Sequence, residues 1–196
     1  MSTGNRSKSE PVERLELHLK YLFDHGVNFK DRVITLASDI DEDEFLRIDA
    51  ALTEMESHNK SNITIRINSG GGSVYDALAI VGRIKRSKAH ITTEGYGAVM
   101  SAATLILASG KVRKFSKFGW WMFHETQHEY EEGTRIRTSQ LEAELAQEKR
   151  EHELWCNAMA EFSNKDKGYW LSRGVYVDQY FSPEELLDLG VVDEIL

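Results

Sequence analysis

NITIRINSGGGSVYDALAIVGRI, residues 62–84, contains a strand, a glycine loop and a helix in immediate succession. Isoleucines alternate with polar residues over positions 62–67, which is typical of a β-strand with one buried face. Three glycines follow, and residues 74–84 then have the apolar spacing of a helix. A strand joined to a helix in this way is the repeating unit of an α/β protein.

The same alternation continues on both sides of this unit. Before it, residues 32–37 predict a strand, and the acidic residues 39–44 predict the start of a helix that runs to about Met55. After it, residues 90–93 predict a third strand and residues 101–108 a further helix. Because strands and helices alternate, we expect parallel strands joined by right-handed crossovers, and therefore an α/β fold.

The N-terminal region differs in composition from the rest of the chain. Residues 1–11 are polar, so we expect a mobile tail, and residues 15–23 predict a short amphipathic helix that ends at Gly26. We therefore divide the chain into an N-terminal segment, residues 1–26, and one domain, residues 27–196.

A long helix dominates the second half of the chain. Two short strands are predicted at residues 112–115 and 120–123, and a helical pattern then runs through residues 138–162. This helix is charged through its middle and is too polar to be packed on all sides. The sequence leaves open whether it is solvated or is an arm that pairs with another subunit. Pro183 marks the first turn of a last helix.

The composition excludes several classes of function. The chain has 196 residues and a formal charge of −8, whereas nucleic-acid binding needs a concentrated basic surface. No segment is long and apolar enough to span a membrane, and the first residues lack the apolar stretch of a signal peptide. Cys156 is the single cysteine, and its helical surroundings predict a core residue. We expect a cytoplasmic protein without membrane or nucleic-acid partners.

Three side chains of catalytic type occur in the second half of the chain. Ser101 is expected at the start of a helix, His124 ends the aromatic run of residues 119–123, and Asp178 is flanked by apolar residues. Burial of a carboxylate is costly unless it is paired, so we expect Asp178 to be partly buried beside a partner. Each residue alone has a commoner structural explanation, such as an N-cap for the serine. Together they fit the roles of nucleophile, base and orienting residue.

The glycine loop, residues 70–72, predicts a site for a negatively charged oxygen. Glycines have no Cβ, so their backbone N–H groups can come close to a ligand oxygen. Because neighbouring parallel strands end at the same edge, the loop and Ser101 are expected to place two N–H donors side by side. The loop lacks the lysine or further glycines of the common nucleotide-binding motifs.

In their order along the chain, these motifs resemble the Clp protease proteolytic subunit from about residue 27 to residue 196. In that family the nucleophilic serine lies nine positions before the glycine that follows its helix, and counting back from Gly110 selects Ser101. An alignment on Met100 instead places Val99 at the nucleophile position, but it needs a compensating insertion. The resemblance rests on residues 32–36, 67–72, 97–110, 122–124 and 178–193.

The resemblance implies a role for each site residue. Ser101 is the nucleophile, His124 the base and Asp178 the residue that orients the base, while the backbone N–H groups of Gly71 and Ala102 form the oxyanion hole. It implies the Clp protease/crotonase-like fold, a ββα superhelix of stacked strand–helix units. A long handle helix projects from this fold, in a handle region at about residues 125–163.

The resemblance also implies how the subunit works with others. Seven-membered rings stack in pairs and enclose a chamber, which an ATP-dependent AAA+ unfoldase of the Clp type feeds with unfolded polypeptides. The ATP is used by that partner, so the subunit itself needs no cofactor and no metal. The chain departs from the family at Gly70, where a proline is usual, and at Glu125 and Thr126, where glutamine and proline are usual.

Three alternatives differ in chemistry. Residues 124–128 fit the HExxH pattern of zinc proteases, with Glu142 or Glu144 as third ligand, but that pattern requires a helix and residues 119–123 predict a strand. A crotonase-type acyl-CoA enzyme has a similar pair of N–H donors without a Ser-His-Asp set. The last alternative is a Clp-like subunit without catalytic activity.

Overall fold

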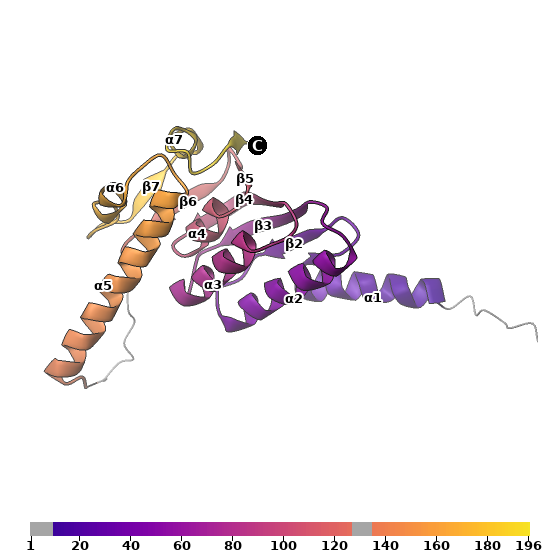
Figure 1. Ribbon diagram of the computed structural model, residues 1–196, viewed down its shortest axis with the longest axis horizontal. Coiled ribbons are helices and arrows are strands. Elements are labelled where there is room, and N and C mark those ends of the chain that lie inside the picture. The colour runs from indigo at the N-terminus through magenta and orange to yellow at the C-terminus, as the bar shows by residue number, and fades with distance from the viewer. Residues whose placement is uncertain (1–9, 127–134) are drawn as a thin grey trace, which may run out of the picture.

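A branched eight-stranded sheet forms the centre of the computed structural model (Figure 1), which describes residues 10–126 and 135–196. Its first two strands are antiparallel, and the strands that follow along the main layer are parallel to one another. The order across this layer is β1 (Val27–Asn28), β2 (Val33–Leu36), β3 (Ile63–Ser69), β4 (Ile91–Met100), β5 (Val112–Phe115) and β8 (Glu194–Ile195). The predicted parallel strands are confirmed.

The sheet branches at β4. The first half of this strand pairs with β5, whereas Ala98–Met100 pair in parallel with β6 (Trp120–Phe123). β7 (Gln179–Phe181) then adds to β6 in the antiparallel direction. The prediction that the strand ends at residue 93 was wrong, because β4 continues to Met100.

Two glycines allow β4 to continue. A Cβ on Gly95 would lie 2.5 Å from the Phe115 ring, and one on Gly97 would lie 2.5 Å from the Asn68 side chain. Gly97 also has a positive φ of 53°, and Asn68 Oδ1 accepts a hydrogen bond of 2.9 Å from the Ala98 N–H. These two glycines therefore permit close packing within a strand.

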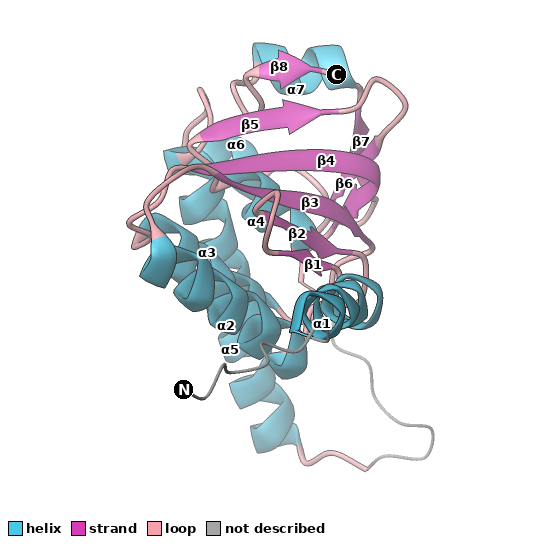
Figure 2. Cartoon of the chain, turned by 90° about the vertical axis from the view of Figure 1, so that its right-hand side faces the viewer, coloured by secondary structure: helices cyan, strands magenta, loops and turns pink. Residues whose placement is uncertain are grey.

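The helices lie mostly on one side of the sheet (Figure 2). Several begin with the capping residues expected for their positions: Asp41 accepts a hydrogen bond from the Glu44 N–H, and Ser182 forms a capping box with Glu185. The helices are α1 (Glu10–His25), α2 (Glu42–His58), α3 (Val74–Lys85), α4 (Ala103–Ala108), α5 (Thr138–Glu161), α6 (Lys167–Leu171) and α7 (Pro183–Asp188). None of these described helices is long and apolar enough to cross a membrane.

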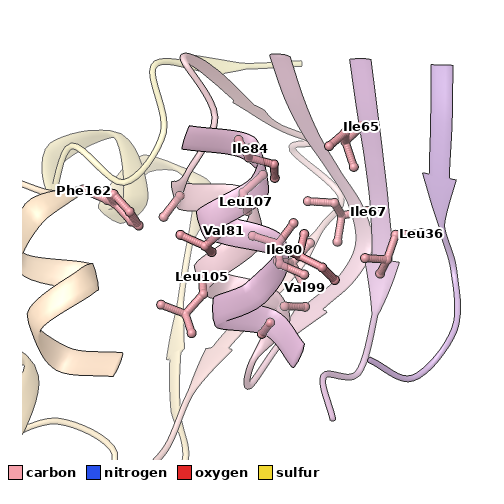
Figure 3. Packing of buried hydrophobic residues seen from close by; sticks show 14 of the residues in the cluster. Leu36, Ile65, Ile67, Ile80, Val81, Ile84, Val99, Leu105, Leu107 and Phe162 are labelled. Atoms are coloured by element: carbon pink, nitrogen blue, oxygen red, sulfur yellow. The ribbon is translucent and has the colours of Figure 1, made fainter. Parts of the chain in front are cut away.

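The main core lies between α3 and the sheet (Figure 3). Ile80 on α3 and Ile65 and Ile67 on β3 are completely inaccessible to solvent. Burying each such side chain contributes about 1.5–3 kcal/mol relative to leaving it exposed. This packing holds the glycine loop between β3 and α3 at a fixed position on the edge of the sheet.

α5 extends away from the body of the molecule (Figure 1). Its C-terminal part is anchored by Trp155, Cys156 and Met159, which are fully buried, and Cys156 is the core residue that was predicted. Its N-terminal part is exposed, including Leu141 and Leu145. The long helix is therefore an arm whose first turns project from the body, whereas its later residues pack against the body.

Candidate active site

Ser101 occupies a tight turn between β4 and α4. The prediction that it starts the helix was wrong by two residues, because α4 begins at Ala103. Ser101 has a φ of 51°, a left-handed conformation that costs a residue with a Cβ about 1–2 kcal/mol. Its N–H donates to the Met122 carbonyl (2.9 Å) and its carbonyl accepts from the Thr104 N–H (3.0 Å). These bonds hold the strained turn and expose the hydroxyl at the strand end.

His124 lies directly beside this turn. Since β4 and β6 are parallel with Met100 opposite Met122, the residues that follow the two strands emerge together. His124 Nε2 lies 2.7 Å from Ser101 Oγ, within hydrogen-bond distance. The Trp155 ring packs edge-on against the imidazole at 5.9 Å between centroids.

The surroundings favour a neutral His124. Burial lowers the pKa of its imidazole, and the nearby charges of Asp178 and Glu125 raise it without cancelling the effect of burial. A neutral imidazole can accept the proton of the Ser101 hydroxyl. The pair therefore has both the geometry and the protonation state of a nucleophile and its general base.

Asp178 does not complete this arrangement in the described conformation. It is exposed, and His124 Nδ1 is buried without a hydrogen-bond partner among the described residues. The prediction that Asp178 is partly buried was wrong, because its apolar neighbours are themselves exposed, Tyr176 to 93% and Val177 to 66%. The carboxylate is nevertheless close enough for its charge to raise the pKa of His124.

The glycine loop lies against the Ser101 turn. A Cβ on Gly71 would lie 2.6 Å from Ser101 Cβ and 3.1 Å from the Ala102 nitrogen, so the loop and the turn are in contact as predicted. Ile40 fixes the loop, since its N–H donates to the Gly71 carbonyl and its carbonyl accepts from Ser73, both at 2.8 Å. The Gly71 N–H, however, donates to Ser69 Oγ at 3.1 Å.

The zinc-protease alternative requires a helix at residues 124–128, and the described part of this segment is not helical. Residues 124–126 follow β6 without helical structure, and His128 lies outside the described residues. Glu142 and Glu144 belong to the projecting part of α5. Within residues 10–126 and 135–196, no three or more His, Cys, Asp or Glu side chains gather as a metal site.

The structure places further residues at the site, and the sequence analysis did not single out Tyr75 or Glu151 among them. A cavity of about 400 Å³ is lined by both Ser101 and His124. Tyr75, Thr126 and Glu151 contribute to the same cavity. The sequence does not distinguish Glu151 from the other charged residues of the long helix, because the residues that share the cavity with it are distant in the chain.

Comparison with known proteins agrees with this architecture. The family model described as Clp protease matches residues 23–196. The chain is 28% identical to the ATP-dependent Clp protease proteolytic subunit 1 of Rhodococcus jostii over 171 residues, which cover 86% of this chain and 76% of that protein. It is 27% identical to the ATP-dependent Clp protease proteolytic subunit of Oltmannsiellopsis viridis, with 85% of each chain covered.

A solved structure shows the same fold. A ClpP1 mutant from Listeria monocytogenes matches with a TM-score of 0.77 and 24% sequence identity, over 86% of this chain and 92% of that chain. The predicted fold of stacked strand–helix units is confirmed. The fold and the site define a peptidase. The chain belongs to the Clp protease family. This membership does not favour the two alternatives of an acyl-CoA enzyme and a Clp-like subunit without activity.

Proposed function

We propose that the chain is a serine endopeptidase subunit in which Ser101 and His124 carry out the bond cleavage. The distance of 2.7 Å between Ser101 Oγ and His124 Nε2 is the observation that carries this proposal. Ser101 Oγ attacks the peptide carbonyl while His124 takes its proton, and His124 then protonates the leaving amine. Water hydrolyses the resulting acyl-enzyme by the same proton transfers in reverse.

Asp178 is proposed to orient His124 by accepting a hydrogen bond from its Nδ1–H. The unpartnered Nδ1 and the effect of the Asp178 charge on the pKa of His124 support this role. Asp178 has to move closer to Nδ1 for the bond to form, because Nδ1 has no hydrogen-bond partner among the described residues. Tyr176 and Val177, directly before Asp178, have exposed side chains, and this supports contact with another subunit as the cause of that movement.

The N–H groups of Gly71 and Ala102 are proposed as the oxyanion hole. The close approach of the Gly71 backbone to Ser101 and Ala102 supports the assignment. The Gly71 N–H exchanges its bond to Ser69 Oγ for one to the oxyanion, which attracts it more strongly because it is charged. One such donor typically lowers the barrier by about 3 kcal/mol.

The subunit is proposed to act in the cytoplasm within seven-membered rings stacked in pairs. An AAA+ unfoldase of the Clp type delivers unfolded polypeptides and uses the ATP, so the subunit needs no cofactor or metal of its own. Membership of the Clp protease family and the projecting α5 support this assembly. We assign docking or pore functions to residues 1–26 and contacts between rings to the handle region, residues 125–163.

Replacement of the nucleophile tests the proposed function. We expect Ser101→Ala to lower the cleavage of fluorogenic peptides and unfolded polypeptides by roughly 10⁴-fold or more. A fluorophosphonate reagent should label the wild-type protein at Ser101 and leave the variant unlabelled. Unchanged peptide cleavage by Ser101→Ala would show that another group is the nucleophile. Activity that chelation removes and zinc restores would support the metal-dependent alternative.

A further inference from the structure

The cavity beside the catalytic pair has walls of two kinds. Val74, Tyr75 and Trp155 supply apolar surface, and Glu151 supplies a carboxylate. Because Ser101 and His124 line the same cavity, a substrate side chain next to the cleaved bond is within reach of it. A volume of about 400 Å³ is sufficient for a long side chain.

Glu151 is held in place at the cavity by two neighbours. The Tyr75 hydroxyl donates a hydrogen bond to Glu151 Oε1, and Gln147 Nε2 donates to the Tyr75 oxygen at 2.7 Å. Gln147 Nε2 also lies 3.4 Å from the same carboxylate oxygen. These contacts connect α5 to the start of α3, so the position of the carboxylate is set by two helices.

The negative charge of Glu151 has no cation beside it among the described residues. Both of its hydrogen bonds reach Oε1, which leaves Oε2 without a partner in this part of the chain. The remaining described residues of the cavity wall include no lysine or arginine, and burial keeps His124 neutral. A half-buried carboxylate with a free oxygen attracts a cationic hydrogen-bond donor.

We propose that this cavity binds a positively charged side chain, arginine or lysine, of the residue that precedes the cleaved bond. The aliphatic part of such a side chain packs against Val74 and Trp155, and its charged end reaches Glu151 Oε2. An acidic side chain is repelled, and an apolar one leaves the carboxylate without a partner. This specificity rests on the proposed serine peptidase function and adds a substrate class to it.

Matched peptides that differ only in charge test the proposal. Coumarin-amide peptides with arginine, citrulline or leucine before the reporter are compared by kcat/KM, since citrulline has the shape of arginine without its charge. We expect arginine to exceed citrulline by about tenfold or more, the range of one charge-assisted hydrogen bond. Glu151→Gln retains the acceptor for Tyr75 and removes the charge, so it should bring the ratio of arginine to citrulline close to one.

A second carboxylate on the same helix provides the control. Glu153 lies two residues further along α5 and pairs with Lys167 Nζ at 3.0 Å, outside the cavity wall. Glu153→Gln should therefore retain the preference for arginine. Equal rates for arginine and citrulline, faster cleavage after leucine, or a preference that survives in Glu151→Gln overturns the inference.

The fluorophosphonate label separates failure of the inference from failure of the proposed function. A protein that is labelled at Ser101 but shows no preference for arginine, or cleaves none of the three peptides, contradicts only the assignment of the cavity. A protein that is not labelled and does not cleave contradicts the peptidase mechanism itself, and the inference with it.

Discussion

Ser101 Oγ and His124 Nε2 lie 2.7 Å apart, although 23 positions separate the two residues in the chain. The parallel pairing of β4 with β6 brings them together, because Met100 and Met122 are opposite each other and both strands end nearby. The His124 imidazole is therefore placed by the backbone register of the sheet. In contrast, Asp178 belongs to an irregular segment and lacks a corresponding constraint.

The pH dependence of peptide cleavage should reflect the burial of His124. Burial lowers the pKa of its imidazole below the usual histidine value of 6.5. Because only the neutral form can accept a proton, we expect kcat/KM to rise with pH and to reach half of its maximum below about pH 6.5. A pH–rate profile with a fluorogenic peptide measures this value, and a midpoint clearly above 6.5 would contradict a desolvated base.

Asp178→Asn tests the orienting role through the same profile. The carboxylate raises the pKa of His124, so its removal should move the acidic limb to lower pH. If Asp178 also orients the imidazole, kcat should fall by up to about 10⁴-fold. Asp188→Asn, on the exposed side of α7, removes the same charge at a distance and should change neither quantity. An unshifted limb in Asp178→Asn would place Asp178 outside the catalytic group.

The glycine loop offers a pair of neighbouring substitutions with opposite expected outcomes. Gly71 has a φ of 109°, and a Cβ there would lie 2.6 Å from Ser101 Cβ, so Gly71→Ala should displace the loop and lower kcat by about 10²-fold or more. A Cβ on Gly70 would have no atom within 4 Å. Gly70→Ala should retain activity, and equal losses in both variants would contradict a specific role for Gly71.

Most of the fold could be predicted because burial follows simple periods along the chain. β5 and β6 match the residues predicted for them, and α3 differs by one residue at its end. Both α3 and β6 present one apolar face to the core. The extension of β4 could not be predicted. Glycine favours a loop when considered alone, whereas Gly95 and Gly97 here provide space for side chains that approach from elsewhere in the fold.

Only the part of the site that follows from the order of strands and helices along the chain could be predicted. Gly71 and Ser101 follow neighbouring parallel strands, so their proximity follows from the predicted topology. The place of His124 beside Ser101 was implied only by the family resemblance, because the pairing of β6 with β4 was not predicted. The environment of Asp178 was misjudged because apolar neighbours indicate burial only if they face the core, and Tyr176 does not. The place of Glu151 in the cavity could not be predicted from the sequence, because it depends on where α5 packs against the body of the molecule.

Glu56 connects α2 to α3 and should make stability depend on pH. It lies 3.0 Å from Arg83 Nη2 and accepts a hydrogen bond from the Lys88 N–H. Burial raises the pKa of its carboxyl, but hydrogen bonds from Arg83 and Ser87 outweigh burial and lower the pKa overall. A lowered pKa in the folded state stabilises the protein above the unfolded pKa of about 4.3, and this contribution disappears as pH falls through the folded pKa.

Glu56→Gln is therefore expected to reduce the free energy of unfolding by about 1–3 kcal/mol at pH 7. At a pH below the folded pKa of Glu56 the difference should largely disappear. Urea unfolding at one protein concentration measures both values. Glu54→Gln is the control, because Glu54 is exposed and pairs with the exposed His58, and it should cost less than about 0.5 kcal/mol. A loss that is equal at both pH values would rule out the charged hydrogen bonds as its cause.

The exposed leucines of α5 make the assembly testable by substitution. Leu141 and Leu145 are four residues apart and lie on the same side of the projecting helix, with exposed fractions of 49% and 48%. An apolar surface of this kind on an arm favours contact with another protein chain. If the arm joins two rings, Leu145→Glu should convert the double ring to single rings, because it places a charge in the contact.

Sedimentation velocity at one protein concentration measures this change. Ala143→Glu is the matched control, since it adds the same charge on the opposite side of the helix, where we expect no contact. The control should retain the size of the wild-type assembly. An unchanged size in Leu145→Glu would show that the leucines are outside the contact, and a monomeric wild-type protein would contradict the ring itself. Because Ser101 and His124 are already paired within one chain, a single ring should still be labelled at Ser101 by a fluorophosphonate.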